Sequence, residues 1–151
     1  MTAKPALPAF VLDASVTAAW LLPEERTPAA ERAYMQLRAS AVEAHVPELW
    51  LWECSNIIAN AVKRRRVAVR DAQPLWALLD SVRTRVDVVS FEPAQVRACL
   101  ALAVDEALSV YDAAYLWLAM SLGVPLLTHD ERLAAAAQRQ RVEAWRVEKL
   151  V

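Results

Sequence analysis

Residues 9–15 read AFVLDAS, and the apolar run that opens this stretch stops at Asp13. Four consecutive apolar residues bounded by an acid indicate a short strand that is buried on both faces. From Ser15 onward the pattern is helical until Pro23 interrupts it. A buried strand followed at once by a helix is typical of a parallel sheet covered by helices, and it places Asp13 at the carboxyl end of the first strand.

The rest of the chain repeats this alternation of strand and helix. Further strands are predicted at residues 44–46, 86–91, 125–128 and 142–147. Helices are predicted from Pro28, from Pro47 to about Arg66, over 69–85 and 95–106, from Ser109 to Gly123, and after Asp130. The pattern predicts an α/β fold with a parallel sheet covered on both faces, in a single domain over residues 1–151. Ligands of such folds bind beyond the carboxyl ends of the strands, where the strand order reverses.

The composition is that of a globular protein outside the membrane. Of the 151 residues, 57% are hydrophobic and 23% are charged, which argues against disorder. No apolar stretch reaches the roughly 18 residues of a membrane helix, and the N-terminus lacks the pattern of a secretory signal. Cys54 and Cys99 lie in predicted helices without a metal-binding spacing, which suits a reducing cytosol. We therefore expect a cytoplasmic protein.

Positive charge is concentrated in the middle of the chain, although the net charge is −1. Residues 61–100 carry eight Lys or Arg against four Asp or Glu. The focus of this region is a basic cluster made of Lys63, Arg64, Arg65 and Arg66. The cluster is either a site for nucleic-acid phosphates or a solvated helix C-terminus, where cations suit the helix dipole.

Glycine-dependent nucleotide sites are excluded. Neither GxGxxG nor GxxxxGK[ST] occurs, and Gly123 is the only glycine in the chain. A single glycine cannot build either phosphate-binding loop. The absence of both loops argues strongly against a function that depends on a nucleotide cofactor.

Four acidic residues stand where a doubly wound sheet brings side chains together. Asp13 and Asp130 each follow a predicted strand, and Asp112 begins the helix that leads into one of those strands. Glu53 shares a polar face with Asn56 on an otherwise apolar helix. Converging carboxylates repel one another, and a hard divalent cation such as Mg²⁺ or Mn²⁺ is the usual remedy. Such an ion activates water for attack on a phosphodiester.

Each of these acids also has a purely structural interpretation. Asp13 and Asp130 are suitable helix caps, and Asp112 lies where a capping box needs an acid. Glu53 fits a solvent-facing stripe equally well. His129, beside Asp130, is a lone loop histidine, a kind of residue that more often has no catalytic role. The argument for a functional site is that the fold brings all four acids to one edge.

Four short motifs resemble those of a known family. They are Val11-Leu12-Asp13-Ala14-Ser15, Glu53 with Asn56, Ser109-Val110-Tyr111-Asp112-Ala113, and Leu127-Thr128-His129-Asp130. Their order and spacing, which span almost the whole chain, are similar to the four acidic motifs of PIN-domain ribonucleases. Within that family the resemblance is to the VapC-type toxins of bacterial toxin–antitoxin pairs.

The resemblance implies a fold, an activity and a role for each matched residue. The fold is a three-layer α/β/α PIN-like fold with strand order 3-2-1-4-5, and the activity is a Mg²⁺- or Mn²⁺-dependent endoribonuclease. The implied metal ligands are Asp13, Asp112 and Asp130, and Glu53 completes the catalytic cluster. The implied supporting residues are Ser15, Asn56 and Thr128, of which Ser15 and Thr128 would orient carboxylates by hydrogen bonds. The charge distribution, rather than the resemblance, makes the basic cluster the candidate for RNA binding.

Partners are predicted from the Glu53 helix as well as from the resemblance. Trp50 and Trp52 lie on different faces of that helix, which is apolar nearly all round. One of its faces therefore needs a cover, either the helix over 75–82 or a partner protein. We expect a homodimer, whose early helices would form a groove for the amphipathic segment of an antitoxin.

Two other functions compete with RNA cleavage. One is a PIN-fold protein that binds a partner and has weak or no nuclease activity. The other is a phosphatase-like or response-regulator-like domain, which would need a lysine near its last strands. The late lysine in this sequence, Lys149, comes after the final predicted strand.

Overall fold

The structure is a computed structural model that describes residues 7–150. It contains one parallel sheet in the order β3-β2-β1-β4-β5, which confirms the predicted strand order. Residues 1–6 and 151, included in the predicted domain, lie outside the described part. The strands are β1 (Ala9–Leu12), β2 (Glu43–Pro47), β3 (Asp87–Val89), β4 (Leu126–Leu127) and β5 (Ala144–Trp145).

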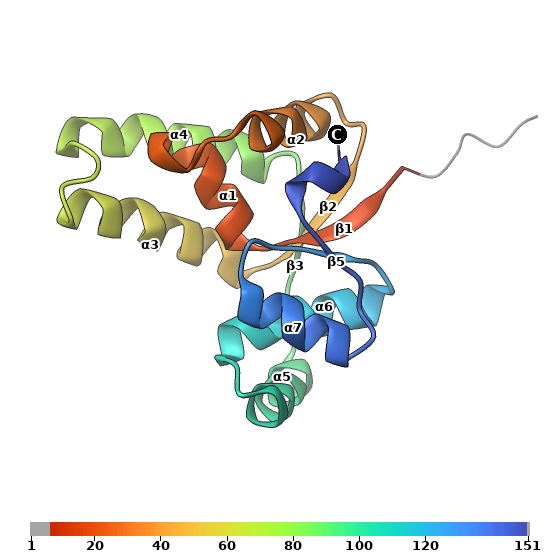
Figure 1. Ribbon diagram of the computed structural model, residues 1–151. Coiled ribbons are helices and arrows are strands. Elements are labelled where there is room, and N and C mark those ends of the chain that lie inside the picture. Colours follow the sequence, from red (N-terminus) through yellow and green to blue (C-terminus); the bar gives the residue numbers. More distant parts are fainter. Residues whose placement is uncertain (1–6, 151) are drawn as a thin grey trace, which may run out of the picture.

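Helices lie on both sides of this sheet, as predicted (Figure 1). On one side are α1 (Ala14–Leu21), α2 (Pro28–Arg38), α3 (Leu49–Lys63) and α4 (Ala72–Arg83). On the other side are α5 (Pro93–Glu106), α6 (Val110–Leu122) and α7 (Glu131–Arg139). Short 3-10 turns complete the chain at η1 (Pro23–Glu25), η2 (Val69–Asp71) and η3 (Val147–Leu150). Helices α3 and α4 run side by side away from the sheet, and their connection forms the tip of this pair (Figure 1).

Local chemistry fixes the helix ends that border the site. The Ser109 hydroxyl accepts the Asp112 N–H at 3.0 Å at the start of α6. Asp130 Oδ1 accepts the N–H groups of Arg132 and Leu133 at the start of α7. Gly123 ends α6 with a φ of 65°, a left-handed conformation that glycine adopts without steric cost. These three predicted caps are confirmed.

Some predicted boundaries are wrong. The strands expected over 86–91 and 142–147 shorten to β3 and β5, which lie at the two edges of the sheet and pair on one side only. The Glu53 helix ends at Lys63 rather than Arg66, because Arg65 adopts a φ of 59°. The helix predicted over 69–85 opens with the 3-10 turn η2 and becomes α-helical at Ala72.

The core is centred on β1. Phe10, Val11 and Leu12 are at most 1% exposed, and β1 pairs with β2 on one side and β4 on the other. Burying each large apolar side chain stabilises the fold by roughly 1.5–3 kcal/mol. Residue 13 therefore directly follows a strand that is buried and paired on both sides. Among residues 7–150, no helix has both the length and the apolar character to cross a membrane.

Candidate active site

The strand order reverses between β1 and β4, and all four predicted acids come from elements that meet there. Asp13 follows β1, Asp130 follows β4, Asp112 lies in the first turn of α6, and Glu53 lies in the second turn of α3. Their charges act on one another: Asp112 and Asp130 raise the pKa of Asp13, and Asp13 and Asp112 raise the pKa of Glu53. The structure thus brings the four carboxylates to the position where α/β folds bind ligands, near enough for their charges to interact, although no three of the described side chains form a metal-ligand set.

Asp13 is the most deeply buried of the four, with 4% of its surface exposed. Its Oδ2 accepts hydrogen bonds from the Ser15 hydroxyl at 2.6 Å and the Thr128 hydroxyl at 2.8 Å. Burial raises the pKa of Asp13, and the two hydroxyls oppose that shift. Because both bonds end on Oδ2, the other oxygen, Oδ1, is left to take a different ligand.

The two hydroxyls are themselves held by the loop after β4. The Ser15 oxygen accepts the backbone N–H of His129 at 2.9 Å, and the Thr128 oxygen accepts that of Asp130 at 3.0 Å. Each hydroxyl therefore has a fixed orientation, with its proton directed at Asp13. His129 contributes its backbone here, while burial lowers the pKa of its imidazole.

Glu53 is held by a residue that sequence analysis missed. The hydroxyl of Tyr115 donates to Glu53 Oε1 at 2.6 Å, and Tyr115 is fully buried. Burial raises the pKa of Glu53 to about 7, although the tyrosine hydrogen bond acts in the opposite direction. A detectable signal was the spacing, because Tyr115 follows Asp112 by three residues and so shares its face of α6.

A second missed contact joins the helices that carry Asp13 and Glu53. The indole N–H of Trp50, in α3, donates to the Thr17 hydroxyl, in α1, at 3.0 Å. Both side chains are fully buried. Thr17 lies one turn after Asp13, and Trp50 lies one turn before Glu53. The contact therefore fixes the spacing of these two carboxylates.

Asp112 and Asp130 are partly buried at the rim of the site. Burial raises the pKa of Asp112, and repulsion from Asp130 adds to this shift. The Arg132 guanidinium lies close enough to lower the pKa of Asp112, and it donates to the Ala107 carbonyl at 3.0 Å. Asp130 caps α7 through Oδ1 only, so its Oδ2 is left for a further ligand.

Other predicted site residues lie farther out. Asn56 is exposed one turn beyond Glu53 and is not among the described groups that hydrogen-bond to the four acids. Lys63, Arg64 and Arg65 are exposed at the tip of the α3–α4 pair, about 15 Å from Glu53 along α3 (Figure 1). Arg66 forms ion pairs with Glu24 and Glu25 of η1.

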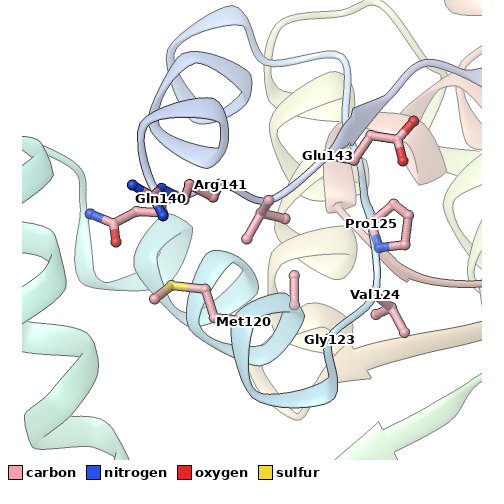
Figure 2. A pocket seen from close by; sticks show the side chains of 9 residues that line it. Met120, Gly123, Val124, Pro125, Gln140, Arg141 and Glu143 are labelled. Carbon is pink, nitrogen blue, oxygen red and sulfur yellow. The ribbon is translucent and has the colours of Figure 1, made fainter.

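A cavity lies at the end of the sheet opposite to the four acids. It has a volume of 460 Å³, and Figure 2 shows Met120 and Gln140 on one side of it and Pro125 and Glu143 on the other. Pro125 and Glu143 precede β4 and β5, so the cavity lies at the amino ends of these strands. It is separate from the four acids, which lie at the carboxyl ends.

The residues of the acidic cluster suit a hard divalent cation. Every candidate ligand is a carboxylate oxygen, the donor that Mg²⁺ and Mn²⁺ prefer. Burial is the main cause of the raised pKa of Glu53 and Asp112, and a cation would relieve the repulsion from the other acids that adds to it. Within residues 7–150, no three His, Cys, Asp or Glu side chains stand ready as a ligand set. Binding a metal ion here would therefore require the carboxylates to move closer together than they are in this structure.

Comparison with known proteins assigns the chain to a family. The sequence model of the PIN-domain family matches residues 10–139 of this chain. Ribonuclease VapC3 of Pyrobaculum aerophilum is 35% identical over 129 residues, which cover 83% of this chain and 92% of that protein. The chain belongs to the PIN-domain family, as its four motifs predicted.

Solved structures agree with this assignment. PAE2754 from Pyrobaculum aerophilum superposes with a TM-score of 0.73 at 25% identity, covering 96% of this chain and 95% of that one. A toxin–antitoxin complex from Klebsiella pneumoniae contains a chain with a TM-score of 0.58 at 14% identity, covering 83% and 90%. At 14% identity, the second likeness supports the fold alone.

The raised pKa of Glu53 predicts that the metal-free protein loses stability as pH rises from 4.5 through about 7. The folded state binds the Glu53 proton more tightly than the unfolded chain, so the stabilisation is complete below this window and lost above it. Because Glu53 is partly exposed, we expect a loss of about 1–2 kcal/mol.

Thermal unfolding in a chelator across this window measures the effect. Glu53→Gln should reduce the pH dependence without abolishing it, because burial raises the pKa of Asp13 and Asp112 as well. A wild-type melting temperature that rises across the window would contradict the prediction.

Proposed function

We propose that this protein is a Mg²⁺- or Mn²⁺-dependent endoribonuclease that acts in the cytoplasm as the toxin of a toxin–antitoxin pair. The observation that carries the proposal is the buried Asp13 carboxylate, held through one oxygen at the switch point with three other acids around it. The 35% identical relative is named as a ribonuclease, which supports RNA as the substrate.

In this proposal the acids divide into metal ligands and a base. Asp13, Asp112 and Asp130 would hold the ion, which when bound supplies an acidified water and stabilises charge on the phosphate. Ser15 and Thr128 keep Asp13 Oδ1 turned to the ion. Glu53, which is not assigned to the ion, would accept a proton from water. Its pKa of about 7 applies to the metal-free protein and would fall when the ion binds.

Tyr115 would act as a positioning residue for Glu53. Its hydroxyl occupies Oε1, so the proton would be accepted on Oε2. Because Tyr115 is buried and close-packed, the Glu53 carboxylate cannot rotate freely away from the cluster. The same contact excludes water from one side of the carboxylate.

Replacing a ligand carboxylate tests metal-dependent cleavage. Asp13→Asn and Asp112→Asn should each lower the RNA cleavage rate by at least about a hundredfold, because each removes a charge from the ion. Asp80→Asn is a matched control, since Asp80 lies away from the site on α4, where it pairs with Arg83. The melting temperature should show that both site variants still fold.

Two outcomes would decide against the proposal. Full cleavage by both site variants, or by the wild type in EDTA, would remove metal catalysis from these acids. An inactive wild type that still binds a protein partner would favour the alternative, a PIN-fold binding protein with weak or no nuclease activity.

We further propose that Lys63, Arg64 and Arg65 bind RNA phosphates away from the cleavage site. All three are exposed at the tip of the α3–α4 pair. Arg66 has a different role in this proposal, because its guanidinium pairs with Glu24 and Glu25 and so joins the turn after α3 to η1. These ion pairs leave it less available to a phosphate.

Replacing Lys63, Arg64 and Arg65 together by Gln should weaken RNA binding and reduce the slope of log affinity against log salt by about two. Arg66→Gln alone should change the slope less. Fluorescence anisotropy with a labelled single-stranded RNA at several salt concentrations gives both values. Equal slopes for the wild type and the triple variant would show that the cluster does not bind RNA phosphates and is only a solvated helix end.

Association with other chains is the last part of the proposal. Trp50 is fully buried inside the protomer, whereas Trp52, two residues on, is 81% exposed. Helix α4 therefore covers α3 without covering Trp52. We propose that this face of α3 contributes to a homodimer and that the toxin also binds a cognate antitoxin, as in the toxin–antitoxin complex that shares its fold.

Sedimentation at micromolar concentration should show a dimer for the wild-type chain. Trp52→Ala should shift the equilibrium toward monomer, because a large exposed aromatic side chain is a typical interface anchor. Trp76→Ala is the matched control, since Trp76 is 42% exposed on the neighbouring helix α4. A wild type that sediments as a monomer would contradict the homodimer.

A further inference from the structure

A small apolar cavity lies at the same edge of the sheet as the four acids. Its volume is 160 Å³, and its walls include Pro47, Leu49, Phe91 and Tyr111. Pro47 is the last residue of β2, and Phe91 follows β3 by two residues. The cavity therefore opens at the carboxyl ends of the strands, where this fold binds ligands.

Helix geometry places this cavity next to the acidic cluster. Leu49 precedes Glu53 by one turn of α3, and Tyr111 precedes Tyr115 by one turn of α6. Glu53 and Tyr115 are in contact at 2.6 Å. Leu49 and Tyr111 therefore lie about 6 Å along their helix axes from the two residues that make that contact. Tyr111 also directly precedes Asp112 in the first turn of α6.

The cavity has aromatic walls of two kinds. Phe91 is fixed, because its ring packs edge-on against Trp117 at a centroid distance of 5.2 Å and its N–H donates to the Glu48 carboxylate at 3.1 Å. Tyr111 is different, because it lines the cavity and is 61% exposed. More than half of its surface is therefore open to a ligand, and its neighbour Asp112 belongs to the cluster.

We propose that this cavity binds one unpaired base of the RNA next to the phosphate that is cleaved, with Tyr111 as the stacking surface. This inference rests on the proposed ribonuclease function. Single-stranded RNA is recognised by splaying out bases and stacking them on aromatic side chains. A small apolar cavity beside an acidic cluster suits a flat, uncharged base better than a phosphate, which the carboxylates repel.

The kinetics of RNA cleavage test the inference. The substrate is a short unstructured RNA that the wild-type chain cleaves at one site in Mg²⁺ or Mn²⁺. Tyr111→Ala should raise KM about tenfold, the effect of losing one stacked base, with a smaller change in kcat. Tyr111→Phe keeps the ring and should stay within about twofold of wild type. Met120→Ala, on the far end of α6, is the matched control.

Abasic substrates distinguish base stacking from a general loss of binding. Removing the base at one position beside the cleaved bond should raise the wild-type KM about tenfold. The same removal should leave the KM of Tyr111→Ala unchanged, because the stacking partner is already absent. Since no charge is involved, the salt dependence of KM should be the same for both chains.

The outcomes separate this inference from the proposed function. If the wild type cleaves no RNA, the proposed function fails and this inference fails with it. If the wild type cleaves but Tyr111→Ala matches it on every substrate, only the base-binding cavity is overturned. A Tyr111→Ala chain that sediments as a smaller species, while abasic and intact substrates behave alike in the wild type, would assign the cavity to a protein contact instead.

Discussion

The buried carboxylate of Asp13 is the constraint on which the site depends. Burying an unpaired carboxylate costs several kcal/mol, so its hydrogen bonds are required for the fold as well as for any chemistry. Both come from hydroxyls, Ser15 and Thr128, whose oxygens are held by backbone N–H groups of the loop after β4. The relative position of β1 and β4 is therefore set at their carboxyl ends by one acid, in addition to the register that pairs Leu12 with Leu127.

This arrangement leaves most of the repulsion among the acids in place, since Arg132 acts on Asp112 alone among the shifted acids. Hydroxyl donors neutralise no charge, and the pKa of Asp13, Glu53 and Asp112 is raised in each case, first by burial and then by the other acids. A bound cation would remove this repulsion, and the free energy released would add to its binding affinity. Rigid supports such as the Trp50 indole on Thr17 keep the carboxylates from separating to relieve their repulsion.

Local patterns predicted the parts of the structure that are determined locally. The β1 run, the caps of α6 and α7, and the glycine that ends α6 were all readable, because each depends on residues a few positions apart. The contact of Tyr115 with Glu53 spans 62 residues, and that of Trp50 with Thr17 spans 33. The spacing in the sequence places Tyr115 on the same face of α6 as Asp112. Its partner on another helix depends on how the helices cross, which the spacing does not record. The edge strands were predicted too long because β-branched or aromatic residues, Val86 and Phe91 around β3 and Val142 and Val147 around β5, flank the paired positions.

The charge distribution around the site implies a division of labour in the proposed ribonuclease. The exposed cations of the basic cluster lie about 15 Å from Glu53, too far to touch the phosphate that reacts and near enough to hold the strand on either side of it. Close to the acids, a phosphate is repelled until a metal ion is present. Positioning of the substrate there must come from neutral contacts, and Tyr111 with the apolar cavity beside it offers such a contact at the edge of the cluster. Affinity would then depend on salt through the distant cations, whereas the choice of the cleaved bond would depend on the base that the cavity accepts.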